Sequence, residues 1–257
     1  MTETPVLARV LSAAQTLRDR CRALCDAPGA LGPEVTHVYH PLDYAWPAFE
    51  AYARLLLAKP VETLWVGMNP GPWGMAQTGV PFGEVAAVRV WLGIDAAIGK
   101  PPPSEEHPKR PVTGLDCPRS EVSGRRVWGL FAEVYDAPQA MAGRHAVLNS
   151  NPCLFLEATG KNRTPDKLPA DLRAGLQQAC DDALVEVIDA LAPKRLAGVG
   201  KFAEKVAVRV VEQLASEHPD TVLPEVFGVL HPSPASPAAN RGWAPQARAS
   251  VEAAGGW

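Results

Sequence analysis

Four short apolar segments, separated by stretches with helical spacing, constrain the fold of this chain more strongly than any other feature. Loop-type residues follow each segment, as is typical of buried strands. The segments cover residues 63–68, 146–149, 195–199 and 226–230. Helical periodicity marks residues 6–24, a segment after Pro47, and residues 168–191 and 202–216. Strands that alternate with helices predict an α/β fold, here a three-layer α/β/α sandwich with a short, mainly parallel four-stranded sheet.

Composition and charge exclude several classes of protein. The chain has 257 residues, 47% of them hydrophobic and 21% charged, so we expect one domain over residues 1–257. It has no apolar run long enough to span a bilayer and no signal peptide, which predicts a cytoplasmic protein without a membrane partner. The formal net charge of −3 argues against a broad polyanion-binding surface but leaves room for a local basic groove.

The cysteines and histidines show no spacing typical of a metal site. No C-x-x-C pair occurs, the spacing does not resemble that of a four-cysteine iron–sulfur cluster, and the six histidines are dispersed. The cysteines are Cys21, Cys25, Cys117, Cys153 and Cys180. We therefore expect no metal, no cofactor, and buried or idle thiols in a reducing cytoplasm.

A loop of unusual composition follows the first predicted strand. Residues 67–84 read GMNPGPWGMAQTGVPFGE, with Asn69 where the strand ends. Glycines let the backbone approach a ligand closely, and prolines stiffen a loop so that its hydrogen-bond donors stay aimed. Taken alone, the segment predicts only a small-ligand loop, because a structural strand–turn–helix corner can also be rich in glycine.

Two further loops follow predicted strands. Residues 231–243 read HPSPASPAANRGW and form a stiff polar loop, unsuited to packing, that begins at His231. Asn149 opens the segment NSNP, which by itself is typical of a turn. Ligands of parallel sheets bind at the carboxyl ends of the strands, so we expect the three loops to meet at one site.

Together the three loops resemble the uracil-DNA glycosylase superfamily, and most closely its single-strand-selective monofunctional branch. GMNPGPWGMAQTGVPFGE and HPSPASPAANRGW match that branch almost residue for residue, while VLNSNPCLFLEATGKNRTP and GVGKFAE agree more weakly. The likeness runs from about residue 64 to residue 243. The classical uracil branch has Asp in place of Asn69, and the mismatch-specific branch lacks a histidine at the position of His231, so this pair favours the branch named.

The resemblance implies a DNA repair glycosylase that flips a uracil-type base out of DNA and hydrolyses its N-glycosidic bond. His231, if neutral, would donate a hydrogen bond to the negative charge that develops on uracil O2. Asn69 would hold the attacking water in line with C1′, where orientation replaces a strong base. No lysine falls within the three motifs, so we expect hydrolysis without a lyase step.

The resemblance also implies a pocket for the flipped base. Asn149 would donate to O4 and accept from N3–H of uracil, whereas cytosine reverses both groups. Phe82 would stack on the base. The backbone around Met68, Gly71 and Met75 would line the C5 edge, where Gly71 leaves space, and the family accepts 5-hydroxymethyluracil as well as uracil.

The segment 232–243 resembles the family's DNA-invading wedge. Ser233 and Ser236 would hold flanking phosphates, and Arg241 would support the minor-groove side. The family often places a basic residue at the position of Ala235, so we expect weaker duplex binding or product retention here.

Two other segments are expected to lie near the DNA or on the surface. Gly200 and Lys201, between a strand and a helix, would offer backbone N–H groups to phosphate. Residues 99–126 are rich in proline and charge, and the sequence leaves open whether they are a functional loop or a solvated insertion.

Three alternatives stay open. The first is a glycosylase of the same fold that prefers xanthine or hypoxanthine. The second is a non-catalytic module that binds damaged bases, although such a module would not need both Asn69 and His231. The third is an α/β enzyme that uses the glycine-rich loop to bind a nucleotide phosphate.

The expected partner is DNA, single- or double-stranded. The protein is expected to be a monomer located with the DNA, in the nucleoid if the cell is bacterial.

Overall fold

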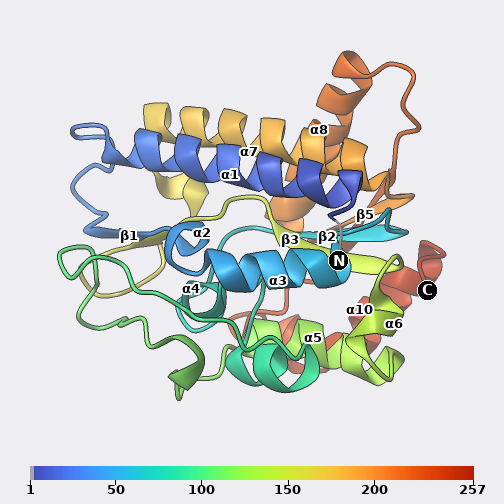
Figure 1. Cartoon of the computed structure of the whole chain (residues 1–257), viewed down its shortest axis with the longest axis horizontal. Coiled ribbons are helices and arrows are strands. Elements are labelled where there is room, and N and C mark those ends of the chain that lie inside the picture. The colour runs from blue at the N-terminus through green and yellow to red at the C-terminus, as the bar shows by residue number, and fades with distance from the viewer. Residues whose placement is uncertain (1–2) are drawn as a thin grey trace.

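The four predicted strands form one parallel sheet in a computed structural model that describes residues 3–257 (Figure 1). Their order in space is β3-β2-β5-β6, and neighbouring strands run parallel throughout. The bounds are β2 (Thr63–Gly67), β3 (His145–Asn149), β5 (Arg195–Val199) and β6 (Glu225–Val229). All five residues of β2 are buried, as expected for the inner strand of a sheet covered on both faces.

Helices cover both faces of this sheet, which confirms the predicted three-layer sandwich (Figure 1). Above it lie α1 (Pro5–Asp26), α7 (Ala170–Leu191) and α8 (Lys201–Glu217), and below it lie α5 (Val122–Val134) and α10 (Trp243–Ala253). The indole of Trp65 in β2 packs edge-on against Phe131 of α5, with ring centroids 5.1 Å apart. Large apolar side chains thus fix the lower layer against the sheet.

The edge strand β3 is closed by α3 (Trp46–Leu56), the helix predicted after Pro47. The hydroxyl of Tyr52 donates to the carbonyl of Val147 at 2.6 Å and accepts from its N–H at 2.9 Å. One side chain therefore satisfies the backbone groups that an exposed edge would leave open to another strand.

A small antiparallel sheet and several short helices were not predicted. The sheet pairs β1 (His37–Tyr39) with β4 (Leu154–Leu156), each only three residues long. The short helices are α2 (Pro41–Tyr44), α4 (Met75–Thr78), α6 (Pro138–Met141) and α9 (Pro237–Asn240), with a π-helical turn η1 (Ala87–Trp91) and the 3-10 turns η2 (Gly114–Asp116) and η3 (Pro165–Lys167). Periodicity cannot reveal elements of three to five residues, because they span barely one repeat.

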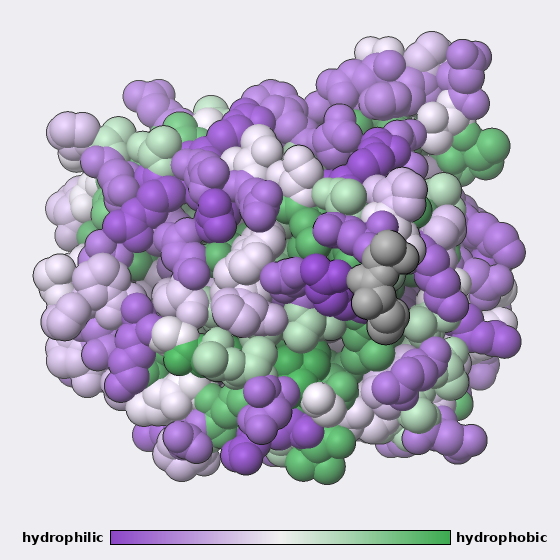
Figure 2. All heavy atoms as spheres, in the orientation of Figure 1, coloured by the Kyte–Doolittle hydropathy of each residue, from purple (hydrophilic) through white to green (hydrophobic). Residues whose placement is uncertain are grey.

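The segment 99–126 is folded against the rest of the molecule rather than solvated along its length. The hydroxyl of Tyr39 donates to the carbonyl of Arg110 and accepts from the N–H of His107, whose side chain is buried. The face shown in Figure 2 is mostly hydrophilic, with scattered apolar side chains. Among residues 3–257, no helix is both long and apolar enough to cross a membrane.

Candidate active site

A cleft of about 760 Å³ opens at the carboxyl ends of the sheet strands, within the range of roughly 300–1,000 Å³ that is typical of small-molecule sites. All three predicted loops contribute to it. Eight of the predicted site residues line it: Met68, Asn69, Gly71, Phe82, Asn149, Lys201, His231 and Ser233. The strand register brings them together, because Gly67 at the end of β2 lies beside Asn149 at the end of β3.

Asn69 is held by its amide nitrogen, which leaves its amide oxygen for the cleft. The nitrogen lies 3.2 Å from the carbonyl of Pro70, 3.5 Å from that of Cys153 and 3.3 Å from Oδ1 of Asn162. All three partners are acceptors, so only the NH2 end of the amide can face them. Asn162, which the sequence analysis did not single out, thus orients the predicted water-holding group.

His231 is held as a neutral imidazole with its proton on Nε2. The backbone N–H of Ser233 donates to Nδ1 at 3.1 Å, so Nδ1 carries a lone pair and Nε2 is the donor. Burial lowers the pKa of His231, which keeps the ring uncharged at neutral pH. Gly200 packs against the ring, and a Cβ added there would lie 2.9 Å from Cδ2. The backbone of the β5–α8 turn therefore fixes the orientation of the imidazole.

Asn149 and Phe82 lie side by side against Gly67 at the end of β2. A Cβ added at Gly67 would come within 2.4 Å of the Phe82 ring and 2.6 Å of Oδ1 of Asn149. The amide nitrogen of Asn149 lies 3.2 Å from the sulfur of Met75, while its Oδ1 is buried without a hydrogen-bond partner. A buried acceptor without a partner costs about 1–3 kcal/mol, so this oxygen is prepared for a donor that enters the cleft.

The backbone of Phe82 adopts a left-handed conformation with φ of +52°, which is rare for an aromatic residue. Close packing enforces it. A Cβ added at Gly124 of α5 would meet the Phe82 carbonyl at 2.0 Å, and Trp128 donates to the carbonyl of Pro81 at 3.2 Å. Strain of this kind clusters at functional sites, where it holds a side chain in a fixed place.

A carboxyl group that the sequence analysis did not identify lies beside the glycine-rich loop. Glu121 accepts from the N–H of Trp73 at 3.1 Å, and a Cβ added at Gly71 would lie 2.2 Å from its carboxyl oxygens. The space that Gly71 was expected to leave for a base is thus filled by Glu121. Burial is the main cause that raises the pKa of Glu121 to about 7, although hydrogen bonds from the loop oppose the shift.

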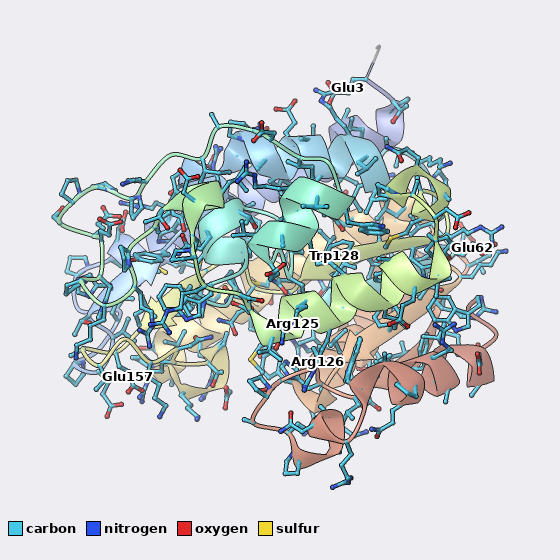
Figure 3. The ribbon with its side chains drawn as sticks, turned by 90° about the horizontal axis from the view of Figure 1, so that it is seen from below. Glu3, Glu62, Arg125, Arg126, Trp128 and Glu157 are labelled. Atoms are coloured by element: carbon cyan, nitrogen blue, oxygen red, sulfur yellow. The ribbon has the colours of Figure 1, made fainter. Side chains whose placement is uncertain are left out.

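Arg126 holds the loop that follows β6. Its guanidinium donates to the carbonyls of Pro232 at 2.9 Å and Ser233 at 3.3 Å, and to Oδ1 of Asn240 at 2.9 Å. Figure 3 shows Arg126 on α5 beside the C-terminal segment. The predicted wedge is therefore braced by a residue from the far end of the 99–126 segment, so this part of the segment is packed rather than solvated.

The family model of the uracil DNA glycosylase superfamily matches residues 57–249, a range that contains every residue lining the cleft. The chain belongs to the uracil DNA glycosylase superfamily. The resemblance seen in the three loops is thereby confirmed, and the matched range agrees with the limits expected from the motifs.

Curated relatives support the same assignment, and one solved structure shares the fold. A single-strand selective monofunctional uracil-DNA glycosylase of Rattus norvegicus is 47% identical over 218 residues, which are 85% of this chain and 76% of that protein. A relative of the same description from Bos taurus is 48% identical over 206 residues, 80% of this chain and 73% of its own. The crystal structure of wild-type SMUG2 from Pedobacter heparinus superimposes with a TM-score of 0.60 at 13% identity, covering 93% of this chain and 98% of that one, and so shares the fold.

Three residues predicted for the site of this superfamily member do not line the cleft. Met75 is buried behind Asn149, whose amide nitrogen it contacts. Ser236 caps α9, where its hydroxyl accepts from the N–H of Ala239 at 3.3 Å. Arg241 is exposed to solvent and is not among the residues that line the cleft. The motif placed all three in the correct loops, but a motif does not say which way a side chain points.

A cationic and aromatic surface borders the cleft of this glycosylase-superfamily fold. The guanidinium groups of Arg110 and Arg119 lie 5.2 Å and 5.1 Å from the ring centroid of Trp73, which itself lines the cleft. The ammonium of Lys201 is exposed and pairs with Glu204 at 2.8 Å. These groups form a local basic rim on a chain with negative net charge, the arrangement that the sequence left possible.

The raised pKa of Glu121 predicts a specific pH dependence of folding. The unfolded carboxyl has its ordinary pKa of 4.5 and the folded one a pKa of about 7, so the folded state binds more protons between these values. Stability therefore falls as the pH rises through this range. Glu121→Gln removes the effect and gains about 2.5 kcal/mol over the parent protein between pH 5 and pH 8.

Urea unfolding of both proteins at these two pH values measures this gain. Glu133→Gln, an exposed carboxyl on α5, is the matched control and keeps the pH dependence of the parent. Equal pH dependence in the parent and Glu121→Gln would show that Glu121 titrates normally.

Proposed function

We propose that this protein is a monofunctional DNA glycosylase that hydrolyses the N-glycosidic bond of uracil, and of 5-hydroxymethyluracil, in DNA and leaves an abasic site. The observation that carries the proposal is the pairing of two oriented groups in one cleft. Both side chains line the cleft. Hydrogen bonds from the amide nitrogen of Asn69 fix its amide oxygen, and a hydrogen bond to Nδ1 of His231 fixes its Nε2–H. The curated relatives, nearly half identical, are named for the same activity.

The first chemical task is to stabilise the leaving base. As the bond between N1 and C1′ breaks, its electron pair moves onto uracil and spreads to O2. His231 donates its Nε2–H to this oxygen and needs no change of protonation, because its ring is neutral before the reaction. A preorganised donor of this kind is worth roughly 10²–10³ in kcat.

The second task is to deliver water to the cationic sugar. Oδ1 of Asn69 accepts a hydrogen bond from one water molecule and aims its oxygen at C1′. The water forms the new C–O bond after the base has largely departed, and its proton passes to solvent. An amide cannot take that proton as a carboxylate would, so the site relies on the orientation of the water. Asn162 contributes to this orientation because it holds the amide of Asn69.

The third task is to select the base. The unpartnered Oδ1 of Asn149 accepts from N3–H of uracil, and the amide nitrogen exchanges its weak sulfur contact for O4. Cytosine would place an acceptor against Oδ1, which leaves two lone pairs facing each other in a buried site. Phe82 provides the stacking surface, which is worth about 1–3 kcal/mol per base.

The packing beneath the base predicts a large effect of a small substitution. Gly67→Ala forces the Phe82 ring and the Asn149 amide to move, because the added Cβ would lie within 2.4 Å and 2.6 Å of them. A displacement of about 1 Å can cost roughly 10²-fold in rate, so we expect kcat/KM for uracil to fall by that factor. Single-turnover cleavage assays measure the effect, with Gly129→Ala on α5, whose Cβ meets open space, as the control. An unchanged rate in Gly67→Ala would mean that these two residues do not form the base pocket.

The nucleotide-phosphate alternative is disfavoured by Glu121. Its carboxyl occupies the space beside Gly71 and Gly74 and accepts the N–H of Trp73, which a phosphate would need. A carboxyl at this place competes with an anion for the same donors.

DNA is the macromolecular partner in this proposal, in keeping with a superfamily of DNA-acting glycosylases. We propose that the substrates are single- and double-stranded DNA and that the protein acts as a monomer without a membrane partner. We also propose that it is located in the cytoplasm with the DNA. Phosphates would lie on the basic rim near Lys201, Arg119 and the exposed Arg241. The exposed side chain of Ala235 at the cleft mouth fills less of the space left by a flipped base than a basic residue would, which favours single strands.

Labelled oligonucleotides with one uracil, in single- and double-stranded form, test the proposal. We expect cleavage at uracil only after alkali treatment, because a monofunctional enzyme leaves the strand intact. Parallel substrates carry 5-hydroxymethyluracil, xanthine or hypoxanthine. Preferred release of a purine would replace the substrate assignment, and binding without any base release would replace the enzyme by a damaged-base binding module.

A further inference from the structure

Four of the five cysteines, scattered along the sequence, gather at one place with a histidine. Cys21 and Cys25 lie one turn apart on α1, Cys153 precedes β4, and Cys180 lies on α7. His40 stands between β1 and α2. All five side chains are buried, between 0% and 6% exposed. The thiols are buried as the sequence predicted, but no sequence spacing indicated that they meet.

The distances between three of these residues match a single tetrahedral ion. The sulfurs of Cys25 and Cys153 and a ring nitrogen of His40 all lie within 4.8 Å of one another. Nδ1 of His40 lies 3.5 Å from the sulfur of Cys153. Bond lengths of about 2.3 Å to sulfur and 2.0–2.1 Å to nitrogen place two tetrahedral zinc ligands about 3.5 Å apart. The pair is therefore already spaced for coordination.

We propose that Cys21, Cys25, His40 and Cys153 bind one structural Zn²⁺ ion. Three thiolates and one imidazole are an established donor set for this ion, and the four ligands close a tetrahedron without an open position. A polynuclear iron–sulfur cluster would hold its cysteines apart by the width of the cluster, whereas the ligand atoms of Cys25, His40 and Cys153 all lie within 4.8 Å of one another.

The surroundings of the group suit such an ion. Cys21 lies one helical turn before Cys25 on α1, and both pack with Cys153 and Cys180 in one buried cluster. Cys180 belongs to the same cluster and would lie outside the coordination shell of the ion.

The ion would join three separate segments next to the cleft. The carbonyl of Cys153 accepts from the amide of Asn69 at 3.5 Å, and its N–H donates to Oδ1 of Asn151 at 2.8 Å. Fixing Cys153 therefore also fixes the loop that positions Asn69. Each ligating thiol loses its proton to solvent when the metal binds, so binding is coupled to pH and to folding.

Metal analysis of the full-length chain, purified under reducing conditions, tests this inference. We expect about one zinc per chain, and no iron or acid-labile sulfide. After removal of zinc, titration with Co²⁺ should give thiolate-to-cobalt charge-transfer bands and the visible absorption of a tetrahedral ion. Zinc should raise the Tm of the metal-free protein. These measurements need no variant, so they decide the question even if a substitution prevents folding.

Two ligand variants and one matched control complete the test. Losing an outer-shell partner typically weakens metal binding by about 10–100-fold. Cys25→Ser and His40→Asn each remove a ligand, so each should weaken zinc binding by more than this. Cys117→Ser removes the remaining buried cysteine, which contacts the carbonyl of Arg119 instead, and should bind zinc like the parent. A reduced parent protein without zinc or a tetrahedral cobalt spectrum would overturn the proposal. So would iron with sulfide, or unchanged zinc binding in both ligand variants.

Discussion

His231→Leu lowers kcat for uracil release by about 10²–10³-fold while the protein still folds and binds DNA. Leucine retains much of the apolar volume against Gly200 but has no donor for the charge on O2. Because that charge develops only as the bond breaks, the loss should appear in kcat rather than in substrate affinity. Single-turnover kinetics on a single-stranded uracil oligonucleotide separate these two quantities.

His218→Leu is the matched control, because His218 lies at the far end of α8 from the cleft. It should leave the rate unchanged. The pH profile adds a second check on His231. Its lowered pKa predicts that activity persists through pH 6.5 and falls only at more acidic pH, when protonation of Nδ1 breaks the bond from Ser233. A His231→Leu rate near that of the parent would exclude the imidazole as the group that stabilises the leaving base.

Asn69→Ala is expected to lower the single-turnover rate by about 10²-fold or more, with little change in DNA affinity. Alanine removes the acceptor that aims the water and also frees Asn162 and the carbonyl of Cys153. The water then reaches C1′ only by diffusion through the cleft.

Two further variants distinguish a catalytic role of Asn69 from a structural one. Asn162→Ala leaves Asn69 in place but removes one of its three anchors, so its rate should fall less than that of Asn69→Ala. Gln178→Ala removes an amide from the surface of α7 and should change nothing. If Asn69→Ala lowered the Tm and DNA affinity as strongly as the rate, its role would be to hold the loop and not the water.

The sequence predicted the parallel sheet because each strand is apolar on both faces, as β2 with Trp65 and its neighbours is. It placed Asn69 and His231 in one cleft because both residues stand in long motifs at strand ends, and their catalytic roles stay predictions. It did not reveal β1 and β4, whose three-residue strands gain their stability from each other across more than a hundred residues.

The residues that support the site were missed for a related reason. Asn162, Glu121 and Arg126 act through contacts with residues between 48 and 114 positions away in the sequence. Asn162 lies in one of the more weakly matching motifs, but nothing in that motif indicated its contact with Asn69. The same holds for the cysteine group, whose ligands come from three separate segments. For Gly71 the sequence predicted a space beside the missing side chain. It did not reveal that the carboxyl of Glu121 fills this space.

Mass-spectrometric detection of the free base tests the central claim most directly. The parent protein and the double variant Asn69→Ala/His231→Leu are each incubated with a single-stranded uracil oligonucleotide, and both the released base and the remaining strand are quantified. We predict one free uracil and one intact strand with an abasic site per turnover from the parent, and neither from the double variant. Equal uracil release by both proteins, or tight binding by the parent without any free base, would contradict the account.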